Sequence, residues 1–153
     1  MKTETPTPRP FEILLVEDRE EDAELARYAF RGVQVAFKLH VTTDGVDALD
    51  FLRKKAPYEN KPRPDVIFLD LNMPGMDGRE LLAELKRDDN LKAIPAIVLT
   101  TSSAPDDIQY AFRTQAAGYI SKPYELERFS QVIKDFADFW LSSDVRLPSI
   151  PAR

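Results

Sequence analysis

The sequence predicts an α/β protein with a doubly wound, five-stranded parallel sheet. Two runs of consecutive apolar residues, 13–16 and 66–69, are typical of strands that are buried on both faces. Strand-like runs alternate five times with segments of helical apolar spacing, as a parallel sheet with helical crossovers requires. The run 66–69 also ends at Asp70, and Pro-Gly and Asp-Gly pairs turn the chain soon after it. An acid at the carboxyl end of a buried strand lies where such sheets bind ligands.

The first half of the chain predicts strand, helix, strand and helix. The strand 13–16 ends in acids, and more acids at 20–22 suit the first turn of a helix that Gly32 closes. Alternation over 37–41 predicts a half-exposed strand. After a turn at 43–45, a second helix ends before Pro57. The expected inward residues are Ala23, Ala26 and Phe30 on the first helix, and Val46, Leu49 and Leu52 on the second.

The second half repeats the alternation three times. A loop with three prolines, 56–64, precedes the strand 66–69, and a helix follows over about 79–88. The run 96–99 predicts the fourth strand, and Ser103 is expected to cap the next helix, with Pro105 in its first turn. A short strand at 118–121 leads into a long helix over roughly 126–141.

Composition limits the classes of protein that the chain can represent. Its 153 residues suit one domain, expected at 11–142 between a flexible segment 1–10 and a tail or arm 143–153. The absence of cysteine excludes disulfides and thiolate metal sites. A net charge of −5 argues against nucleic-acid binding, and no apolar run approaches a membrane span or a secretory signal. We expect a cytoplasmic protein without nucleic-acid or membrane partners.

The predicted strand order, 2-1-3-4-5, brings acids together. It makes the first and third strands neighbours, so Glu17 and Asp18 should lie beside Asp70. Gathered carboxylates repel one another and need a cation or shifted pKa values. An oxygen-only site with open positions suits Mg²⁺, and the backbone carbonyl of Asn72 is placed to join the three carboxylates.

A carboxylate beside Mg²⁺ can attack phosphorus to form an acyl phosphate, which makes Asp70 the candidate nucleophile. Thr100 and Lys122 end the fourth and fifth strands and would offer a hydroxyl and a cation to a phosphoryl group. A cis bond before Pro123, which costs only about 0.5–1 kcal/mol, would turn Lys122 inward. Taken alone, Asp70 could be a simple turn or helix cap, and Thr100 an ordinary strand-end residue.

These elements together resemble the receiver domain of two-component response regulators, a flavodoxin-like fold that includes the chemotaxis regulator. The matching stretches are Leu15-Val16-Glu17-Asp18, Leu69-Asp70 through Asp77-Gly78, Leu99-Thr100 and Lys122-Pro123. The resemblance implies that Asp70 accepts phosphate from a histidine kinase. It also implies that Thr100 is the switch hydroxyl and Tyr119 the switch aromatic; the alternative for Tyr119 is a plain edge-strand residue.

A narrower likeness is to the single-domain regulators of bacterial phytochromes, many of which form homodimers. The stretches that carry this likeness are Asp44-Gly45 through Arg53, the proline loop 56–64, Leu99 through Ser102, and Phe139 through Leu141 before Leu147-Pro148. It implies a bacteriophytochrome or similar sensor as the kinase. With about one helix and a tail after Lys122, output is expected through protein contact or onward transfer to a histidine phosphotransferase.

Some residues depart from the common receiver pattern. Thr101 replaces a small residue that often follows the switch threonine, and would narrow access to the phosphoryl group. Asn72 and Ser102 flank the expected route of an attacking water, so all three should tune the phosphate lifetime. The protein would thus assist its own Mg²⁺-dependent phosphorylation and dephosphorylation without being an enzyme for other substrates.

Two other function classes fit parts of the pattern. A phosphohydrolase with an aspartyl-phosphate intermediate would need an acid where Asn72 stands, and a phosphorylation-independent dimerisation module would show no Mg²⁺ dependence. His40, the single histidine, could be a phosphocarrier but is expected to be solvent-exposed. A set of apolar side chains could form a partner surface or plain core: Tyr119, Phe136, Phe139, Trp140 and Leu147.

Overall fold

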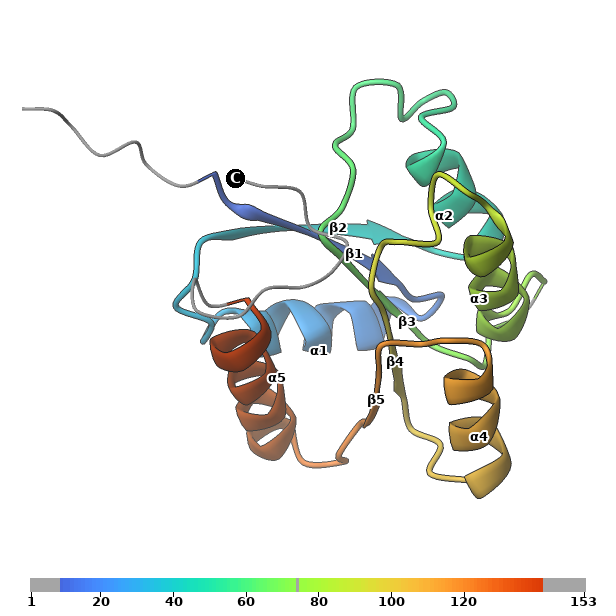
Figure 1. The fold of residues 1–153 in the computed structure, drawn as a ribbon. Helices are drawn as coiled ribbons and strands as arrows, with labels where there is room; N and C mark the ends of the chain where they lie inside the picture. Colours follow the sequence, from blue (N-terminus) through green and yellow to red (C-terminus); the bar gives the residue numbers. More distant parts are fainter. Residues whose placement is uncertain (1–8, 74, 142–153) are drawn as a thin grey trace, which may run out of the picture.

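The computed structural model describes residues 9–73 and 75–141 and confirms the predicted sheet. Its five strands are all parallel, in the order β2-β1-β3-β4-β5 (Figure 1). The strands are β1 (Phe11–Val16), β2 (Phe37–Thr42), β3 (Val66–Leu69), β4 (Ala96–Thr100) and β5 (Gly118–Ser121). The helices are α1 (Glu20–Phe30), α2 (Gly45–Leu52), α3 (Gly78–Arg87), α4 (Pro105–Arg113) and α5 (Leu126–Trp140).

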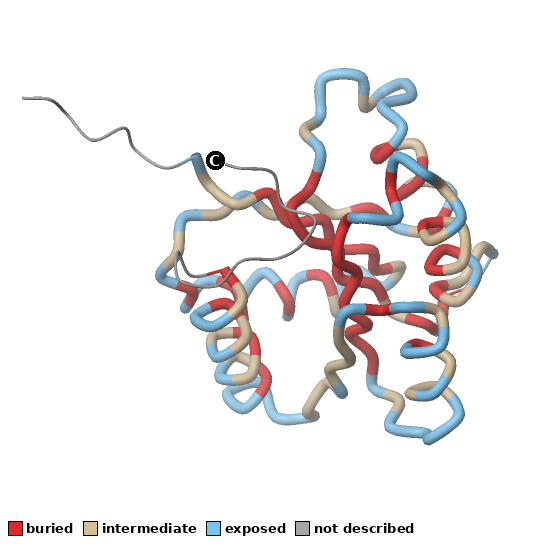
Figure 2. The backbone as a smooth tube through the Cα atoms, viewed as in Figure 1, coloured by how far each residue is buried: buried red, intermediate tan, exposed pale blue. Residues whose placement is uncertain are grey.

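The helices cover the two faces of the sheet unequally. α1 and α5 pack together on one face, and α2, α3 and α4 lie on the other (Figure 1). Every residue of β3 and β4 is buried, so these central strands form the middle of both core clusters (Figure 2). The continuous apolar runs follow from burial on both faces.

Local signals fix the start of α3 close to Asp70. The Asp77 side chain accepts a 3.0 Å hydrogen bond from the backbone N–H of Glu80 and caps the helix. Gly78 follows, and a Cβ there would stand 1.9 Å from the carbonyl oxygen of Asp70. Only glycine permits this approach, which seats the first turn of α3 against the end of β3.

Several local expectations were wrong. The N-cap of α4 is Ala104 and not Ser103, and the hydroxyl of Ser102 instead accepts a 3.2 Å hydrogen bond from the Ala104 N–H. Val46 is 54% exposed, because the buried side of α2 is formed by Ala48, Leu49, Phe51 and Leu52. The expected cis bond between Lys122 and Pro123 is not found: in the described residues the cis peptide bond is Ala56–Pro57.

The expectation that His40 is solvent-exposed was wrong. Its Nε2 lies 3.0 Å from Glu12 Oε2, and its side chain is only 15% exposed. The imidazole ring also packs against Phe51 at a centroid distance of 5.3 Å. The histidine therefore belongs to the packing between β2 and α2.

Parts of the expected organisation lie outside the described residues. Of the segment 1–10, only Arg9 and Pro10 are described, and the whole tail 143–153 with Leu147 is outside. In residues 9–73 and 75–141, no helix has both the length and the apolar character needed to span a bilayer.

Candidate functional site

The register of the sheet brings the expected acids to one edge. Val16 pairs with Leu69, so the residues that follow them, Glu17 and Asp70, leave the sheet side by side. The Asp70 N–H donates to the carbonyl of Val16 at 3.4 Å, which ties the two strand ends together. The carboxyl ends of β1 and β3 thus form the edge at which open parallel sheets bind ligands.

Lys122 reaches the same edge from β5. Its N–H donates to the carbonyl of Thr100 at 2.6 Å, and its side chain is only 11% exposed. The Nζ atom lies 3.7 Å from Glu17 Oε1 and 4.0 Å from Asp70 Oδ2. One buried ammonium group therefore lies between two carboxylates.

Glu17 is the most perturbed group of the site. Burial raises its pKa to about 8, and the nearby carboxylates of Asp22 and Asp70 act in the same direction, while the Lys122 ammonium opposes them. The lysine alone does not compensate the acid pocket. A further positive charge would restore the ionised form of Glu17.

The donor set fits a divalent cation. Glu17 Oε1 and Asp18 Oδ1 are buried carboxylate oxygens that have no hydrogen-bond partner among the described residues. Buried polar atoms normally have partners, so these two oxygens leave room for one. Across the part of the chain described, no three acidic or histidine side chains already stand as a metal cluster. Mg²⁺ needs only one or two carboxylates, because it keeps several waters.

Asp70 is held from its own loop. Its Oδ1 accepts a 3.1 Å hydrogen bond from the N–H of Asn72, and Oδ2 is the oxygen that faces Lys122. The amide oxygen of Asn72 accepts from Arg79 at 3.2 Å. The contacts of Asn72 thus involve its N–H and its side chain, and its expected role as a carbonyl ligand stays a prediction.

Thr100 and Tyr119 meet through the loop after β4. Thr100 is fully buried, and its hydroxyl oxygen accepts a 3.4 Å hydrogen bond from the N–H of Ser102. The Tyr119 hydroxyl donates to the carbonyl of Ser102 at 2.9 Å, and its ring packs against the core on the α2–α4 face. Tyr119 is therefore turned toward this loop, while the Thr101 side chain is exposed.

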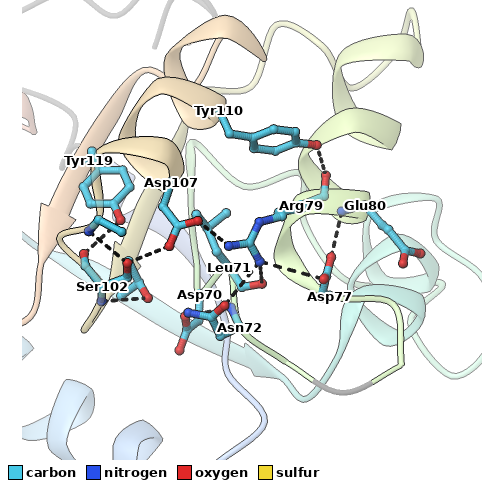
Figure 3. Close-up of polar contacts among 12 residues, drawn as sticks. Asp70, Leu71, Asn72, Asp77, Arg79, Glu80, Ser102, Asp107, Tyr110 and Tyr119 are labelled. Atoms are coloured by element: carbon cyan, nitrogen blue, oxygen red, sulfur yellow. Dashed lines mark hydrogen bonds and ion pairs between the residues drawn. The ribbon is translucent and has the colours of Figure 1, made fainter.

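Two residues of the site were missed from the sequence, Arg79 on α3 and Asp107 on α4. They form an ion pair, and Asp107 also accepts a 2.6 Å hydrogen bond from the Ser102 hydroxyl (Figure 3). An arginine and an aspartate near helix starts are ordinary surface residues in a sequence. Only the packing of α3 beside α4 joins them.

The apolar surface candidates divide between the two faces. Phe136 stacks on Trp140 at 5.3 Å and meets Phe68 edge-on at 5.1 Å, so both α5 rings add to the core on the α1–α5 face. Phe139 is 64% exposed, and Tyr119 packs on the opposite face. The described candidates therefore form no single apolar patch.

Comparison with known proteins agrees with this geometry. The family model described as the response regulator receiver domain matches residues 13–134. The response regulator Rcp1 of Synechocystis sp. is 39% identical over 140 residues, which are 92% of this chain and 95% of Rcp1. A structure of the Mn²⁺-bound form of Rcp1 superposes with a TM-score of 0.82 at 40% identity, covering 91% of this chain and 99% of that one.

Two further solved structures are similar. The phosphorylated cyanobacterial phytochrome response regulator RcpA has a TM-score of 0.84 and 41% identity, over 92% of this chain and 99% of RcpA. The bacteriophytochrome response regulator AtBRR has a TM-score of 0.71 and 37% identity, over 87% and 96% of the two chains. With its family model, fold and strand-end residues in agreement, this chain belongs to the response regulator receiver domain family.

Proposed function

We propose that Asp70 accepts a phosphoryl group from a sensor histidine kinase and that the acyl phosphate is the signal. The observation that supports this role most is the largely buried lysine between Glu17 and Asp70, beside two carboxylate oxygens that have no hydrogen-bond partner among the described residues. Such an edge attracts both a divalent cation and a phosphoryl group. The similarity to Rcp1, RcpA and AtBRR supports a phytochrome-type kinase as the donor.

The residues would divide the transfer chemistry between them. A carboxylate oxygen of Asp70 attacks the phosphorus of the kinase phosphohistidine, the P–N bond breaks, and the imidazole leaves. Lys122 neutralises charge on the phosphoryl oxygens, and the buried Thr100 hydroxyl donates to one of them. Mg²⁺ held by Glu17, Asp18, Asp70 and the Asn72 carbonyl would supply further charge neutralisation.

Output would follow from the added charge. Phosphorylation replaces the singly charged Asp70 carboxylate with an acyl phosphate that carries about two negative charges, which favours Thr100 close to the phosphoryl group and Tyr119 turned toward the loop after β4. The surface of α4, β5 and α5 then changes shape for a partner, either a second copy of this chain or a histidine phosphotransferase. Asn72, Thr101 and Ser102 flank the acceptor and would set how long the phosphate lasts.

Replacing Asp70 tests the assignment directly. After incubation with Mg²⁺ and acetyl phosphate, intact-mass spectrometry should show one phosphate per wild-type chain. Asp70→Asn should show none, because an amide is not a nucleophile at phosphorus. Asp89→Asn, an exposed aspartate on the α3–β4 loop, is the matched control and should be phosphorylated like the wild type. Stoichiometric phosphate on Asp70→Asn would refute the assignment.

The proposed homodimer has its own test. Size-exclusion chromatography with light scattering, with and without Mg²⁺ and beryllofluoride as a phosphoryl mimic, measures the oligomeric state. We expect a shift in mass on addition of the mimic for the wild type and no shift for Asp70→Asn. If the mimic leaves the molar mass of both proteins unchanged, assembly does not depend on phosphorylation.

A further inference from the structure

A chain of polar contacts connects the phosphoacceptor loop to Tyr119 through α3 and α4. It begins at Arg79, in the first turn of α3, and ends at the Tyr119 hydroxyl (Figure 3). The Thr100 hydroxyl is not one of the groups that form this chain of contacts. That hydroxyl adjoins the chain at Ser102, from whose N–H it accepts a hydrogen bond at 3.4 Å.

Arg79 binds both sides of the connection. Its guanidinium donates to the Asn72 amide oxygen at 3.2 Å and to the carbonyl of Leu71 at 3.4 Å, both on the loop that follows Asp70. On the other side it forms the ion pair with Asp107 on α4. The two side chains are 33% and 17% exposed, so this pair is partly shielded from solvent.

Asp107 connects α4 to the loop after β4 through Ser102. It accepts the Ser102 hydroxyl at 2.6 Å, and the carbonyl of the same serine is the acceptor for Tyr119 at 2.9 Å. The Ser102 hydroxyl and the Arg79 guanidinium hold the pKa of Asp107 below its usual range, so the carboxylate is ionised at neutral pH. Asp107 and Tyr119 thus contact the same residue, Asp107 through the Ser102 hydroxyl and Tyr119 through the Ser102 carbonyl.

We propose that Arg79 and Asp107 form a latch that holds Ser102 in place as the acceptor for Tyr119 and so favours the turned-in position of that ring. Both are positioning residues. The inference rests on the proposed function, because it assigns the turned-in ring to the phosphorylated state. Negative charge on the Asp70 loop favours a cation bound there, so the latch and the phosphoryl group stabilise the same arrangement.

Reciprocity makes this latch measurable. If the latch favours the arrangement that binds a phosphoryl group, breaking it must weaken binding of a phosphoryl mimic by the same factor as it depopulates that arrangement. Asp107→Ala is the informative variant, because removing a negative charge near the site would by itself tighten binding of an anion. Binding weaker than in a charge-matched control variant therefore cannot be an effect of charge alone.

Asp106→Ala provides the matched control. Asp106 lies in the same first turn of α4 and carries the same charge, but it is exposed and takes no part in the contacts to Ser102 or Arg79. Protein labelled with 3-fluorotyrosine gives one ¹⁹F signal for each of the five tyrosines, and Tyr119→Phe identifies the signal of interest. The other four signals report whether each variant is folded.

We expect Asp107→Ala to lower the turned-in population of Tyr119 and to weaken beryllofluoride affinity in Mg²⁺, each by about fivefold, the low end of ordinary coupling. Asp106→Ala should match the wild type in both. In a Tyr119→Phe background, Asp107→Ala should have no further effect on affinity, because the hydroxyl that the latch serves is gone.

The outcomes separate the latch from the proposed function. If Asp107→Ala matches Asp106→Ala in the Tyr119 signal or in beryllofluoride affinity, the latch is refuted, whatever happens to thermal stability. If the wild type itself fails to bind the mimic with Mg²⁺, the proposed function fails. Even in that case, the ¹⁹F signal of Tyr119 tests the latch separately: an unchanged ring position in Asp107→Ala would refute it.

Discussion

Both ends of the sheet bury carboxylates, but only one end satisfies them. At the amino end of β3, Asp65 is 3% exposed and accepts hydrogen bonds from Arg9 at 2.9 Å and from the Glu12 N–H at 2.9 Å. Glu12 in turn contacts His40. At the carboxyl end, Glu17 is equally buried, yet one of its oxygens has no hydrogen-bond partner among the described residues.

The difference separates a structural cluster from a binding site. A buried charge whose oxygens all have partners stabilises the fold relative to the same charge left alone, and it has nothing to offer a ligand. A buried carboxylate with free oxygens destabilises the apo protein and gains most when a cation arrives. The two ends should therefore respond in opposite ways to mutation, metal and pH.

The largest effect is expected at the satisfied end. Asp65→Ala should lower the free energy of unfolding by about 3 kcal/mol, because it leaves the Glu12 N–H and the Arg9 guanidinium without their buried acceptor. Urea denaturation measures this change. Asp89→Ala, whose side chain is 90% exposed, should change stability by less than about 0.5 kcal/mol. Equal effects of the two variants would show that burial at Asp65 does not matter.

The next effect belongs to the unsatisfied end. Mg²⁺ at one hundred times its dissociation constant should raise the free energy of unfolding of the wild type by about 2.7 kcal/mol, since the ion binds only the folded protein. Asp18→Asn should lose most of that gain and, without Mg²⁺, be at least as stable as the wild type. Thermal unfolding with and without Mg²⁺ tests both statements. A large loss of apo stability would place Asp18 with the structural carboxylates.

The third effect concerns pH, and it is the smallest when counted for one pH unit. Folded Glu17 has a pKa of about 8, against an ordinary value of 4.5, so the folded state binds the extra proton between these values. Its contribution to stability without metal is complete below pH 4.5 and is lost as the pH rises toward 8. Mg²⁺ competes with the same proton, so its affinity should rise by up to about tenfold, or 1.4 kcal/mol, per pH unit below pH 8.

Isothermal titration at pH 6, 7 and 8 measures that slope. Glu17→Gln carries no titrating proton and should bind Mg²⁺ more weakly, with a flatter dependence on pH. If the wild type and Glu17→Gln have the same slope, the proton that competes with Mg²⁺ does not reside on Glu17.

Much of the fold could be predicted because its signals are local. The strands predicted at 66–69 and 118–121 have those bounds, and the remaining helices and strands agree within a few residues. Continuous burial leaves a continuous apolar run, and Asp77 followed by Gly78 marks a helix start. The errors were also local: Ser103 is a good capping residue in sequence, but the backbone path makes Ala104 the N-cap of α4 and brings the Ser102 hydroxyl to its N–H.

The residues of the candidate site could be predicted for a related reason. Thr100 is the last residue of a strand, and Glu17, Asp18, Asp70 and Lys122 come just after the end of one. Parallel strands all end at one edge. No such rule applies to Arg79 and Asp107, or to Glu12 and His40. Their partners are distant in sequence, and side-chain packing between elements decides whether they meet.

The sequence by itself determined which strands and helices form and which polar residues stand at the carboxyl edge, because burial and turn chemistry act over a few neighbouring residues. The tertiary structure alone decided which of the buried charges are satisfied. At the amino edge Arg9 pairs with Asp65 and His40 contacts Glu12, whereas at the other edge one lysine faces several carboxylates. That imbalance is a property of distances in space, since electrostatic energy depends on the separation of charges and not on their spacing along the chain.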